Sequence, residues 1–340
     1  MRKMATIRKI DSIRDIPGAD SIECCFLGGW NVVTRKGEYS AGDLAVYCEI
    51  DSFIPAIIAP FLTKAGHYAK TFEGVEGERL RTVKLRGQLS QGLLLPLSML
   101  TMVESELFEG LDVSFPLGIV KYEAPISADL AGEVKGMFPS RIPKTDQERI
   151  QNLSAELEEW RAEGLTWEVS EKLDGSSMTV YVIDGEVGVC SRNLDLKRNP
   201  DNSLWRAAIK HGLEPKLVEY GRNIAVQGEL IGNGIQGNMY KFRDQDFYVY
   251  DIYDIDAGRY FTPTERHIFV SEHELNYCPI FKSDFMLTTE TVADLLKMAE
   301  GKSVMGDIVG PEREGLVYKC NERQVSFKTV SNKFLLKGGE

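Results

Sequence analysis

Several features that would place this sequence of 340 residues in a special class are missing. It contains no apolar run near the ~20 residues that a membrane-spanning helix needs, and residues 1–6 lack the apolar core of a signal peptide. Its six cysteines form no CxxC pair and have no neighbouring histidine pattern, so we expect buried free thiols rather than disulfides or a zinc site. We therefore expect a soluble, intracellular protein that makes no contact with a membrane.

Positive charge is also scarce. Lys and Arg number 40 against 51 Asp and Glu, which gives a formal net charge of −11. That balance argues against a protein that coats nucleic acid by bulk positive charge, although it permits a local basic groove. Two clusters are candidates for such a groove, and each is equally compatible with a solvated charged face: Arg79, Arg81, Lys84 and Arg86 in one, and Arg192, Lys197 and Arg198 in the other.

Residues 1 to about 125 lack a long helical pattern. Short apolar segments alternate there with turn signals such as Pro17-Gly18 and Gly28-Gly29. Many short strands with little helix predict a small β-barrel. The strands are expected at 4–10, 22–27, 30–34, 44–49, 80–85 and 92–95.

The rest of the chain predicts a linker over 126–144, rich in proline and glycine, and an α+β domain over 145–340 with largely antiparallel sheets. Thr145 and Glu148 have the spacing of a capping box and predict a helix that runs from there to Gly164. Asp184-Gly185 between two strand-like runs predicts a hairpin. Further helices are expected near 202–211, 263–273 and 289–300, and strands near 166–171, 177–183, 186–191, 224–230, 246–252, 315–319 and 323–328.

The most informative segment is Lys172-Leu173-Asp174-Gly175, directly after the strand-like run 166–171. A lysine at the end of a strand can be presented end-on to a ligand, and the Asp-Gly pair supplies the turn. An ordinary lysine ammonium titrates near ~10.4, so a nucleophilic lysine needs a divalent cation or basic neighbours that disfavour its charged form. By itself, the segment is equally compatible with a lysine on a surface hairpin.

Further segments follow in order along the chain: Ser191-Arg192-Asn193, Gln227–Gly232, Asp246–Ile252, Glu314–Lys319 and Ser326–Lys328. Together with the lysine motif they resemble the covalent nucleotidyltransferases, the superfamily of ATP-dependent ligases and mRNA-capping enzymes, whose first motif is KxDG. Accidental co-occurrence of these segments in this order is not credible.

The resemblance implies a role for each segment. Lys172 would attack the α-phosphorus of ATP and hold AMP as a phosphoramide. Tyr250, with Phe247 as the weaker alternative, would stack on adenine, and Glu314 would have to lie at an irregular strand start. Ser326 replaces the first lysine of the last motif, which leaves Lys328 to grip the α-phosphate. The implied catalytic residues are Lys172, Asp174, Arg192 and Lys328; the nucleotide-binding residues Glu171, Arg149, Asn193, Glu229, Tyr250, Val317, Lys328 and Lys333; and the metal-associated residues, through water, Asp174, Glu229 and Glu314.

The overall plan resembles one branch of this superfamily. Only twelve residues follow Lys328, too few for the C-terminal OB domain of DNA ligases and capping enzymes. The extra module lies at the N-terminus instead, where segments 16–22 and 42–47 look like the opening of OB-type domains. The chain is therefore similar to the nick-sealing RNA ligase family typified by the Deinococcus enzyme.

This resemblance implies an RNA ligase that uses ATP and Mg²⁺ (or Mn²⁺) to join 3′-OH and 5′-phosphate ends at nicks in an RNA duplex, as a monomer. Residues 1–125 would form an OB-like RNA-binding module and residues 145–340 the adenylyltransferase domain. Alternatives are a capping-type guanylyltransferase, a DNA ligase, and, from another class, a non-catalytic RNA-binding protein.

Overall fold

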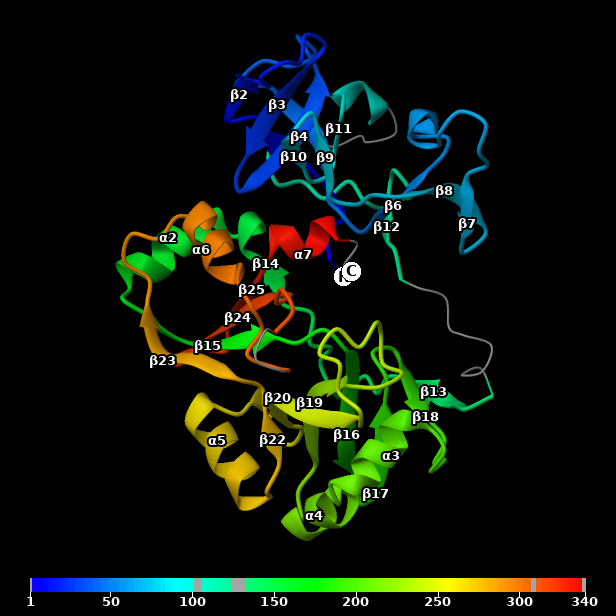
Figure 1. Cartoon of the computed structure of the whole chain (residues 1–340), viewed down its shortest axis with the longest axis vertical. Coiled ribbons are helices and arrows are strands. Elements are labelled where there is room, and N and C mark those ends of the chain that lie inside the picture. Colours follow the sequence, from blue (N-terminus) through cyan, green and yellow to red (C-terminus); the bar gives the residue numbers. More distant parts are fainter. Residues whose placement is uncertain (1, 101–105, 124–131, 307–309, 338–340) are drawn as a thin grey trace. The chain divides into compact units, whose positions relative to one another are not determined.

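The computed structural model describes residues 2–100, 106–123, 132–306 and 310–337, and the chain divides into two compact units (Figure 1). The N-terminal unit comprises residues 1–125 together with 335–340, and the C-terminal unit comprises residues 126–334. The predicted boundary near residue 125 and the start of the predicted linker, 126–131, lie outside the described residues. None of the described helices is long and apolar enough to cross a membrane.

The N-terminal unit is built from short antiparallel strands around a core that includes Ile7, Val46, Leu95 and Val113. Two 3₁₀ turns, η1 (Pro60–Leu62) and η2 (Leu97–Met99), join the strands. In sheet order, the strands are β1 (Ala5–Lys9), β5 (Leu44–Cys48) and β11 (Leu93–Leu95); β2 (Ser12–Asp15), β3 (Ile22–Leu27) and β4 (Trp30–Arg35); β10 (Gln88–Ser90) and β9 (Val83–Leu85); and β12 (Val120–Lys121), β6 (Ser52–Pro55), β8 (Val75–Arg79) and β7 (Lys70–Phe72).

Strands β1, β3, β4 and β5, of five or six residues, and the three-residue β11 lie where the sequence predicts them. The predicted strand 80–85 is wrong in its first half, because only Val83–Leu85 is extended and paired, as β9. Strands β2, β6, β7, β8, β10 and β12 are missed. Apart from β8 they span only two to four residues, and β8 holds a glycine and two glutamates, so period-2 alternation has too few positions to appear.

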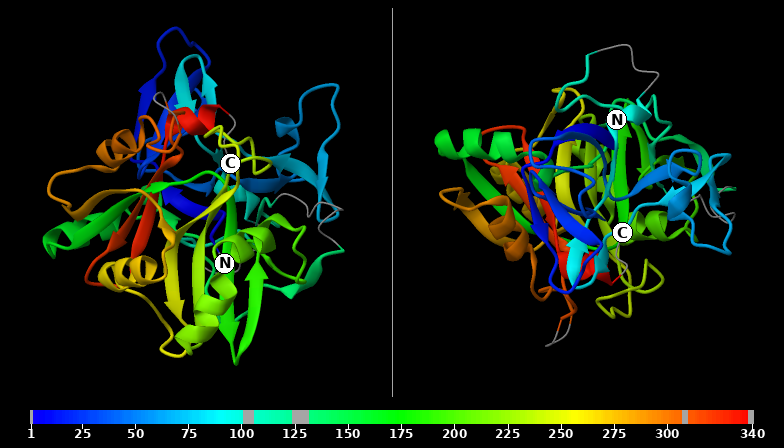
Figure 2. Two further views of the ribbon diagram at one scale, coloured as in Figure 1. Left: turned by 60° about the horizontal axis from the view of Figure 1, so that its bottom comes forward. Right: turned by 90° about the horizontal axis from the view of Figure 1, so that it is seen from above.

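The larger sheet of the C-terminal unit is antiparallel except for β22, which pairs in parallel with β20. Figure 2 shows its long strands, coloured green to yellow, from two further directions. Its order is β13 (Val134–Met137), β18 (Leu194–Leu196), β17 (Glu186–Cys190), β16 (Ser176–Ile183), β19 (Ile224–Ile231), β20 (Asp246–Asp254) and β21 (Arg259–Tyr260), with β22 (Asn276–Tyr277) beside β20.

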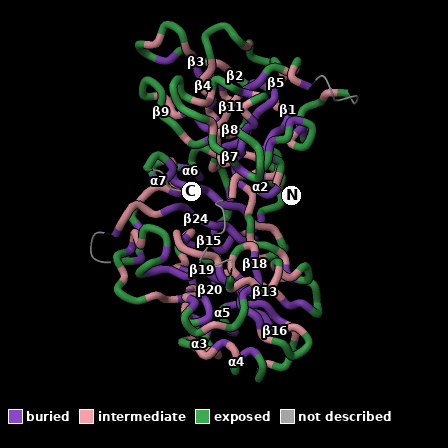
Figure 3. The backbone as a smooth tube through the Cα atoms, turned by 90° about the vertical axis from the view of Figure 1, so that its right-hand side faces the viewer, coloured by how far each residue is buried: buried purple, intermediate pink, exposed green. Residues whose placement is uncertain are grey.

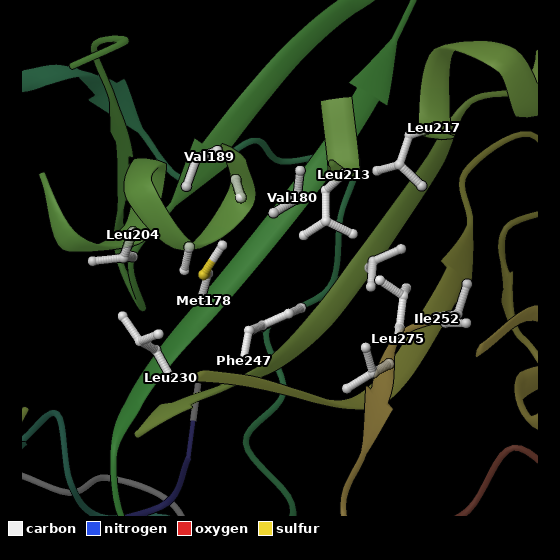
Figure 4. Close-up of a cluster of buried hydrophobic side chains, with 14 of the residues drawn as sticks. Met178, Val180, Val189, Leu204, Leu213, Leu217, Leu230, Phe247, Ile252 and Leu275 are labelled. Atoms are coloured by element: carbon white, nitrogen blue, oxygen red, sulfur yellow. The ribbon is translucent and has the colours of Figure 1, made fainter. Parts of the chain in front are cut away.

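Helices α3 (Ser203–Lys210), α4 (Leu213–Tyr220) and α5 (Pro263–Glu272) cover one face of this sheet. Their apolar side chains pack on strand residues such as Val180 and Phe247, and Figure 4 shows this core. The long strands β19 and β20 are largely buried along their length (Figure 3).

A second sheet has the order β14 (Glu148–Arg149), β25 (Ser326–Val330), β24 (Gly315–Cys320), β15 (Thr166–Lys172) and β23 (Ile280–Met286). One face packs through Trp167, Tyr318 and Phe327 against helices α2 (Ser154–Ala162) and α6 (Val292–Ala299). The other face carries Lys172, Lys319 and Lys328 together with the apolar Val317. A 3₁₀ turn, η3 (Ile150–Asn152), precedes α2, and α7 (Asn332–Leu336) follows β25.

The predicted capping box at residues 145–148 is wrong. Glu148 and Arg149 form β14, parallel to β25, and helix α2 begins only at Ser154. The side chains that would have capped a helix are used elsewhere: the Thr145 hydroxyl bonds the Tyr250 hydroxyl at 2.9 Å, and the Glu148 carboxylate accepts from Asn152. By contrast, the predicted helix near 263–273 is present as α5, which begins with a reciprocal capping box between Thr262 and Glu265.

Candidate active site

Lys172 is the last residue of β15, so its side chain lies at the point where the strand gives way to a turn. Its ammonium pairs with the carboxylate of Glu314, which immediately precedes β24 and is almost fully buried. Glu314 therefore lies outside the regular strand, at the irregular start that the motif requires. The register of β15 with β24 brings the two motifs together, because Lys172 is paired with Gly315.

The turn after Lys172 is held closely against β19. A Cβ atom on Gly175 would lie 2.3 Å from the Leu230 carbonyl oxygen and 3.0 Å from Cγ of Glu229, so only glycine allows this approach. The backbone N–H of Asp174 donates to the Tyr240 hydroxyl oxygen at 2.8 Å. The last glycine of the motif thus serves to bring Glu229 to the lysine turn.

Acidic side chains gather around this turn. Burial raises the pKa of Glu229 to about 8; the Lys172 ammonium opposes this rise, and the carboxylates of Glu314 and Asp174 add to it. The three carboxyl groups predicted to hold a metal ion are therefore close enough to influence one another. Among the described residues, however, no group of three or more His, Cys, Asp or Glu side chains forms a ready-made metal cage.

Arg149, Lys328 and Val317 lie in one row across the second sheet, since β14 pairs Arg149 with Lys328 and β24 pairs Val317 with Lys328. All three are buried. Directly paired strand residues present their side chains on the same face. Two adjacent buried cations beside an apolar residue suit a phosphate chain attached to a planar base.

Tyr250 is the extra residue of a β-bulge, because the register with β19 shifts between Gln227 and Gly228. Its hydroxyl bonds Thr145 at 2.9 Å and Ser177 at 3.3 Å, and the Lys319 ammonium lies 5.5 Å from its ring centroid. A bulge re-aims a side chain out of the pleat. Phe247 is buried in the core of the larger sheet, so the alternative of Phe247 as the stacking residue is wrong.

Arg192 and Asn193 follow β17, and side chains of the segment 143–149 form hydrogen bonds with both of them. One Nη of Arg192 bonds both oxygens of the Asp146 carboxylate at 2.8 and 2.9 Å, and Lys144 donates to Asn193 at 2.6 Å. Arg192 is also near enough to lower the pKa of Glu229. Arg192 therefore contacts Asp146 and lies within electrostatic range of Glu229.

Two predicted residues are engaged elsewhere. Glu171 alternates with Lys172 and points to the opposite face of β15, where its Oε2 accepts from the backbone N–H of Val304 at 3.1 Å. Burial raises its pKa, and its Oε1 has no hydrogen-bond partner in the part of the chain that the structure describes. Lys333 is exposed and pairs with Glu300 at 3.0 Å, which gives no support to a role at the nucleotide.

Sequence reasoning missed a buried ionic network next to Tyr250. Lys319 pairs with Asp251 at 2.8 Å, and Arg266 pairs with Glu168 at 2.8 Å and lies 3.6 Å from Asp251. The Lys319 ammonium also donates to the Tyr250 carbonyl oxygen. The network ties β15, β20, β24 and α5 together behind the bulge. The available signal in the sequence was the presence of charged residues within predicted strands. Each of these residues was equally compatible with a position exposed to solvent.

Comparisons with known proteins indicate the family and the fold. A family model described as RNA ligase matches residues 165–337, and an OB-fold domain model matches residues 4–97. Among solved structures, the Naegleria gruberi RNA ligase with PPi is 45% identical, covers 99% of each chain and has a TM-score of 0.89.

Two mutant structures of the same ligase are equally similar. A lysine-to-alanine mutant with ATP and Mn is 46% identical over 98% of this chain and 99% of that chain, with a TM-score of 0.89. A glutamate-to-alanine mutant with AMP and Mn is 46% identical over 99% of each chain, with a TM-score of 0.90. Among curated protein sequences no match is found. The predicted α+β class, with an N-terminal OB fold and a C-terminal domain of antiparallel sheets, is confirmed.

Proposed function

This chain belongs to the RNA ligase family and is an ATP-dependent RNA ligase, and we propose that it acts as a monomer on nicks in RNA-containing duplexes. The observation that carries the proposal is the group of charged side chains at the end of β15, where the Lys172 ammonium pairs with Glu314 beside Glu229 and Asp174. An amine at a strand end among carboxylates suits attack on a phosphate that a divalent cation holds. Membership of this family removes the capping enzyme, the DNA ligase and the non-catalytic protein as alternatives.

The substitutions carried by the solved Naegleria ligases support the residue roles. Five of them replace a lysine, an aspartate, two glutamates and a second lysine; a sixth replaces a further lysine and has no counterpart at the same offset, where this chain has Glu123. Each of the first five positions is numbered two lower than a residue of the same type in this chain, and the two chains match over almost their full length. The corresponding residues here are Lys172, Asp174, Glu229, Glu314 and Lys328.

The chemistry that these residues would perform has three steps. In the first, Nζ of Lys172 attacks the α-phosphorus of ATP and pyrophosphate leaves, while Glu314 is placed to take the ammonium proton. In the second, an oxygen of the RNA 5′-phosphate attacks the same phosphorus, and the lysine leaves. In the third, the 3′-OH attacks the phosphorus of the 5′-phosphate, a phosphodiester forms and AMP leaves. Arg149 and Lys328 would neutralise the transferring phosphates.

The donor set around Lys172 fits a hard divalent cation such as Mg²⁺ or Mn²⁺. It includes the carboxylates of Glu229, Glu314 and Asp174, and Mg²⁺ keeps several waters, so the ion needs one or two protein carboxylates rather than a closed cage. When bound, the cation would stabilise negative charge on the phosphate oxygens. We assign Glu229 and Glu314 to its water shell, with Asp174 as their neighbour.

The two units would have different functions. Every residue that we assign to nucleotide chemistry lies between Arg149 and Lys328, inside the C-terminal unit. We propose that residues 145–340 form the adenylyltransferase domain and that residues 1–125 form an RNA-binding module.

A strand-swap assay tests nick sealing. We expect substrates with a few terminal ribonucleotides on the 3′-OH strand to be sealed at least ~10-fold faster than all-DNA nicks, because a 2′-OH there adds a hydrogen-bonding group and fixes the sugar pucker. Ribonucleotides placed only on the 5′-phosphate strand are the matched control. Equal rates on all strand combinations, or sealing of single-stranded ends in preference to nicks, would contradict the proposal.

A further inference from the structure

One hairpin of the N-terminal unit concentrates positive charge in an acidic protein. It comprises β9 and β10 with the preceding residues, 81–90, and we call it the basic hairpin. Arg81, Lys84 and Arg86 are all exposed on it. The sequence contains no aspartate or glutamate anywhere from residue 79 to residue 103. This segment is therefore a local region of positive potential in a protein whose net charge is −11.

These three cations have no ion-pair partner among the residues that the structure describes, unlike Arg79 and the arginines of the second basic cluster. Arg79, the fourth member of the cluster, is used inside the fold: it bonds Asp51 at 2.5 and 3.1 Å and stacks over Tyr122. In the second basic cluster, Arg192 pairs with Asp146, and Arg198 pairs with Glu214. Those residues are committed to internal contacts, whereas the cations of the basic hairpin are available to an outside anion.

The shape of the basic hairpin suits a nucleic-acid backbone. Within the described part of the chain its two strands pair only with each other, and the turn residues Arg86 and Gly87 have φ angles of +48° and +85°, which places Arg86 at the tip. Val83 and Leu85 are 44% and 41% exposed on either side of Lys84. A two-stranded ribbon with cations and apolar side chains can follow the shallow minor groove of an A-form duplex, where phosphates and 2′-hydroxyls are accessible.

We propose that the basic hairpin binds the phosphate backbone of the RNA duplex on which the enzyme acts. The proposal rests on the proposed nick-sealing function and names the surface that would hold the substrate. Polyanionic RNA is the occupant that complementary charge favours, since three adjacent unpaired cations release counterions when they meet phosphates.

The test compares two triple variants with the same change in charge. Arg81, Lys84 and Arg86 are each replaced by glutamine in one, and Lys9, Arg35 and Lys36, which lie elsewhere in the same unit, in the other. Affinity for a nicked RNA duplex is measured by fluorescence anisotropy over a range of salt concentrations. We expect the hairpin variant to bind on the order of tenfold or more weakly at ~0.1 M salt, with a salt slope reduced by about 2 to 3.

Formation of the lysine–AMP adduct from ATP alone should stay at the wild-type rate in both variants, which separates an RNA defect from a folding defect. Equal affinity and slope in the hairpin variant and the wild type would overturn the proposal and favour an acidic protein as the occupant of this surface. Because sealing by the wild-type enzyme is measured separately, that result would leave the nick-sealing function standing.

A second, independent observation concerns Tyr240, which no motif identifies. Tyr240 is buried among Leu173, Ile231, Cys278 and Met305, and its hydroxyl accepts the 2.8 Å hydrogen bond from the backbone N–H of Asp174. It therefore touches the lysine turn both through packing on Leu173 and through its polar tip.

The loop that carries Tyr240 is held in a costly conformation. Gln236, Asn238 and Lys241 have φ angles of +46°, +41° and +58°, which L residues other than glycine adopt rarely. The Asn238 side chain fixes the loop by bonding both the N–H and the carbonyl oxygen of Phe242. Strain of this kind persists where surrounding contacts over-determine a loop, and it clusters at functional sites.

We infer that Tyr240 is a positioning residue that sets the turn after Lys172 and so aims its amine. Replacing Tyr240 by phenylalanine keeps the ring but leaves the Asp174 N–H without its acceptor. We expect lysine–AMP formation to slow by about 5- to 100-fold. Sealing of a pre-adenylylated nick, which does not need the lysine as nucleophile, should change by less than about twofold.

Tyr248→Phe is the matched control, because Tyr248 packs on the same apolar cluster and its hydroxyl bonds no residue in the described part of the chain. We expect it to leave both rates unchanged. A Tyr240→Phe variant that loses both activities equally, or neither, would reduce Tyr240 to a packing residue.

Discussion

Lys172→Ala should abolish the covalent enzyme–AMP adduct, a loss of at least ~10³-fold, while a nick that already carries AMP on its 5′-phosphate is still sealed measurably. Only the first two steps use the lysine, as nucleophile and then as leaving group. The third step needs the remaining phosphate-binding residues, of which Arg149 and Lys328 are paired neighbours on strands separate from β15. The measurement is incorporation of labelled ATP into protein, followed by sealing of the pre-adenylylated substrate.

Loss of the fold is the competing explanation for such a result. Lys172 is partly exposed, and its replacement removes one partner of the buried Glu314 carboxylate, so some loss of stability is expected. Lys172→Met keeps more of the aliphatic stem and should show the same loss of adduct with less change in the melting temperature. Label that persists on either variant at the wild-type level would disprove the assignment of the nucleophile.

The sequence was sufficient to identify the chemistry because the motifs are short and local. The strand before Lys172, the hairpin at Asp184-Gly185 and the cap at Thr262 each depend on residues within a few positions of one another, and each is present in the structure. Positive φ angles at Asp184 and Gly185 explain that turn directly.

What the sequence could not provide depends on contacts between distant residues. Thr145 and Glu148 satisfy the local rule for a helix start. The segment forms no helix, however, because Glu148 pairs with β25 and the Thr145 hydroxyl bonds the Tyr250 hydroxyl. Helix α4 was missed because it contains Pro215, which reads as a breaker although its first turn tolerates proline. Tyr240 carries no local signal, since its partner Asp174 lies 66 positions away.

Glu229→Gln should lower the rate of lysine–AMP formation by about 100-fold or more, because it removes the carboxylate that a bound cation would favour at the proposed metal and phosphate site. The same variant should be more stable than the wild type at alkaline pH. The folded-state pKa of Glu229 is about 8, above its ordinary value of 4.5, so the folded protein holds the proton more tightly than the unfolded chain does.

The sign of the stability effect follows from that order of pKa values. The contribution of Glu229 to stability is complete below about pH 4.5 and is lost as pH rises through 8, where the buried carboxyl must ionise. Glutamine cannot ionise, so its advantage should grow between pH 5 and 8 and level off near pH 9, at roughly 1 to 3 kcal/mol in the free energy of unfolding. Glu272→Gln, at an exposed position of α5, should show no such dependence.

A bound divalent cation should connect the role of Glu229 in catalysis with its effect on stability at alkaline pH. A cation beside Glu229 favours its carboxylate form, so millimolar Mg²⁺ should offset the alkaline loss of stability in the wild type and have much less effect on Glu229→Gln. Thermal unfolding at pH 9 with and without Mg²⁺ measures this difference without any catalytic turnover. If Mg²⁺ stabilised both proteins equally, Glu229 would be a strained carboxyl in the nucleotide site that takes no part in holding the metal.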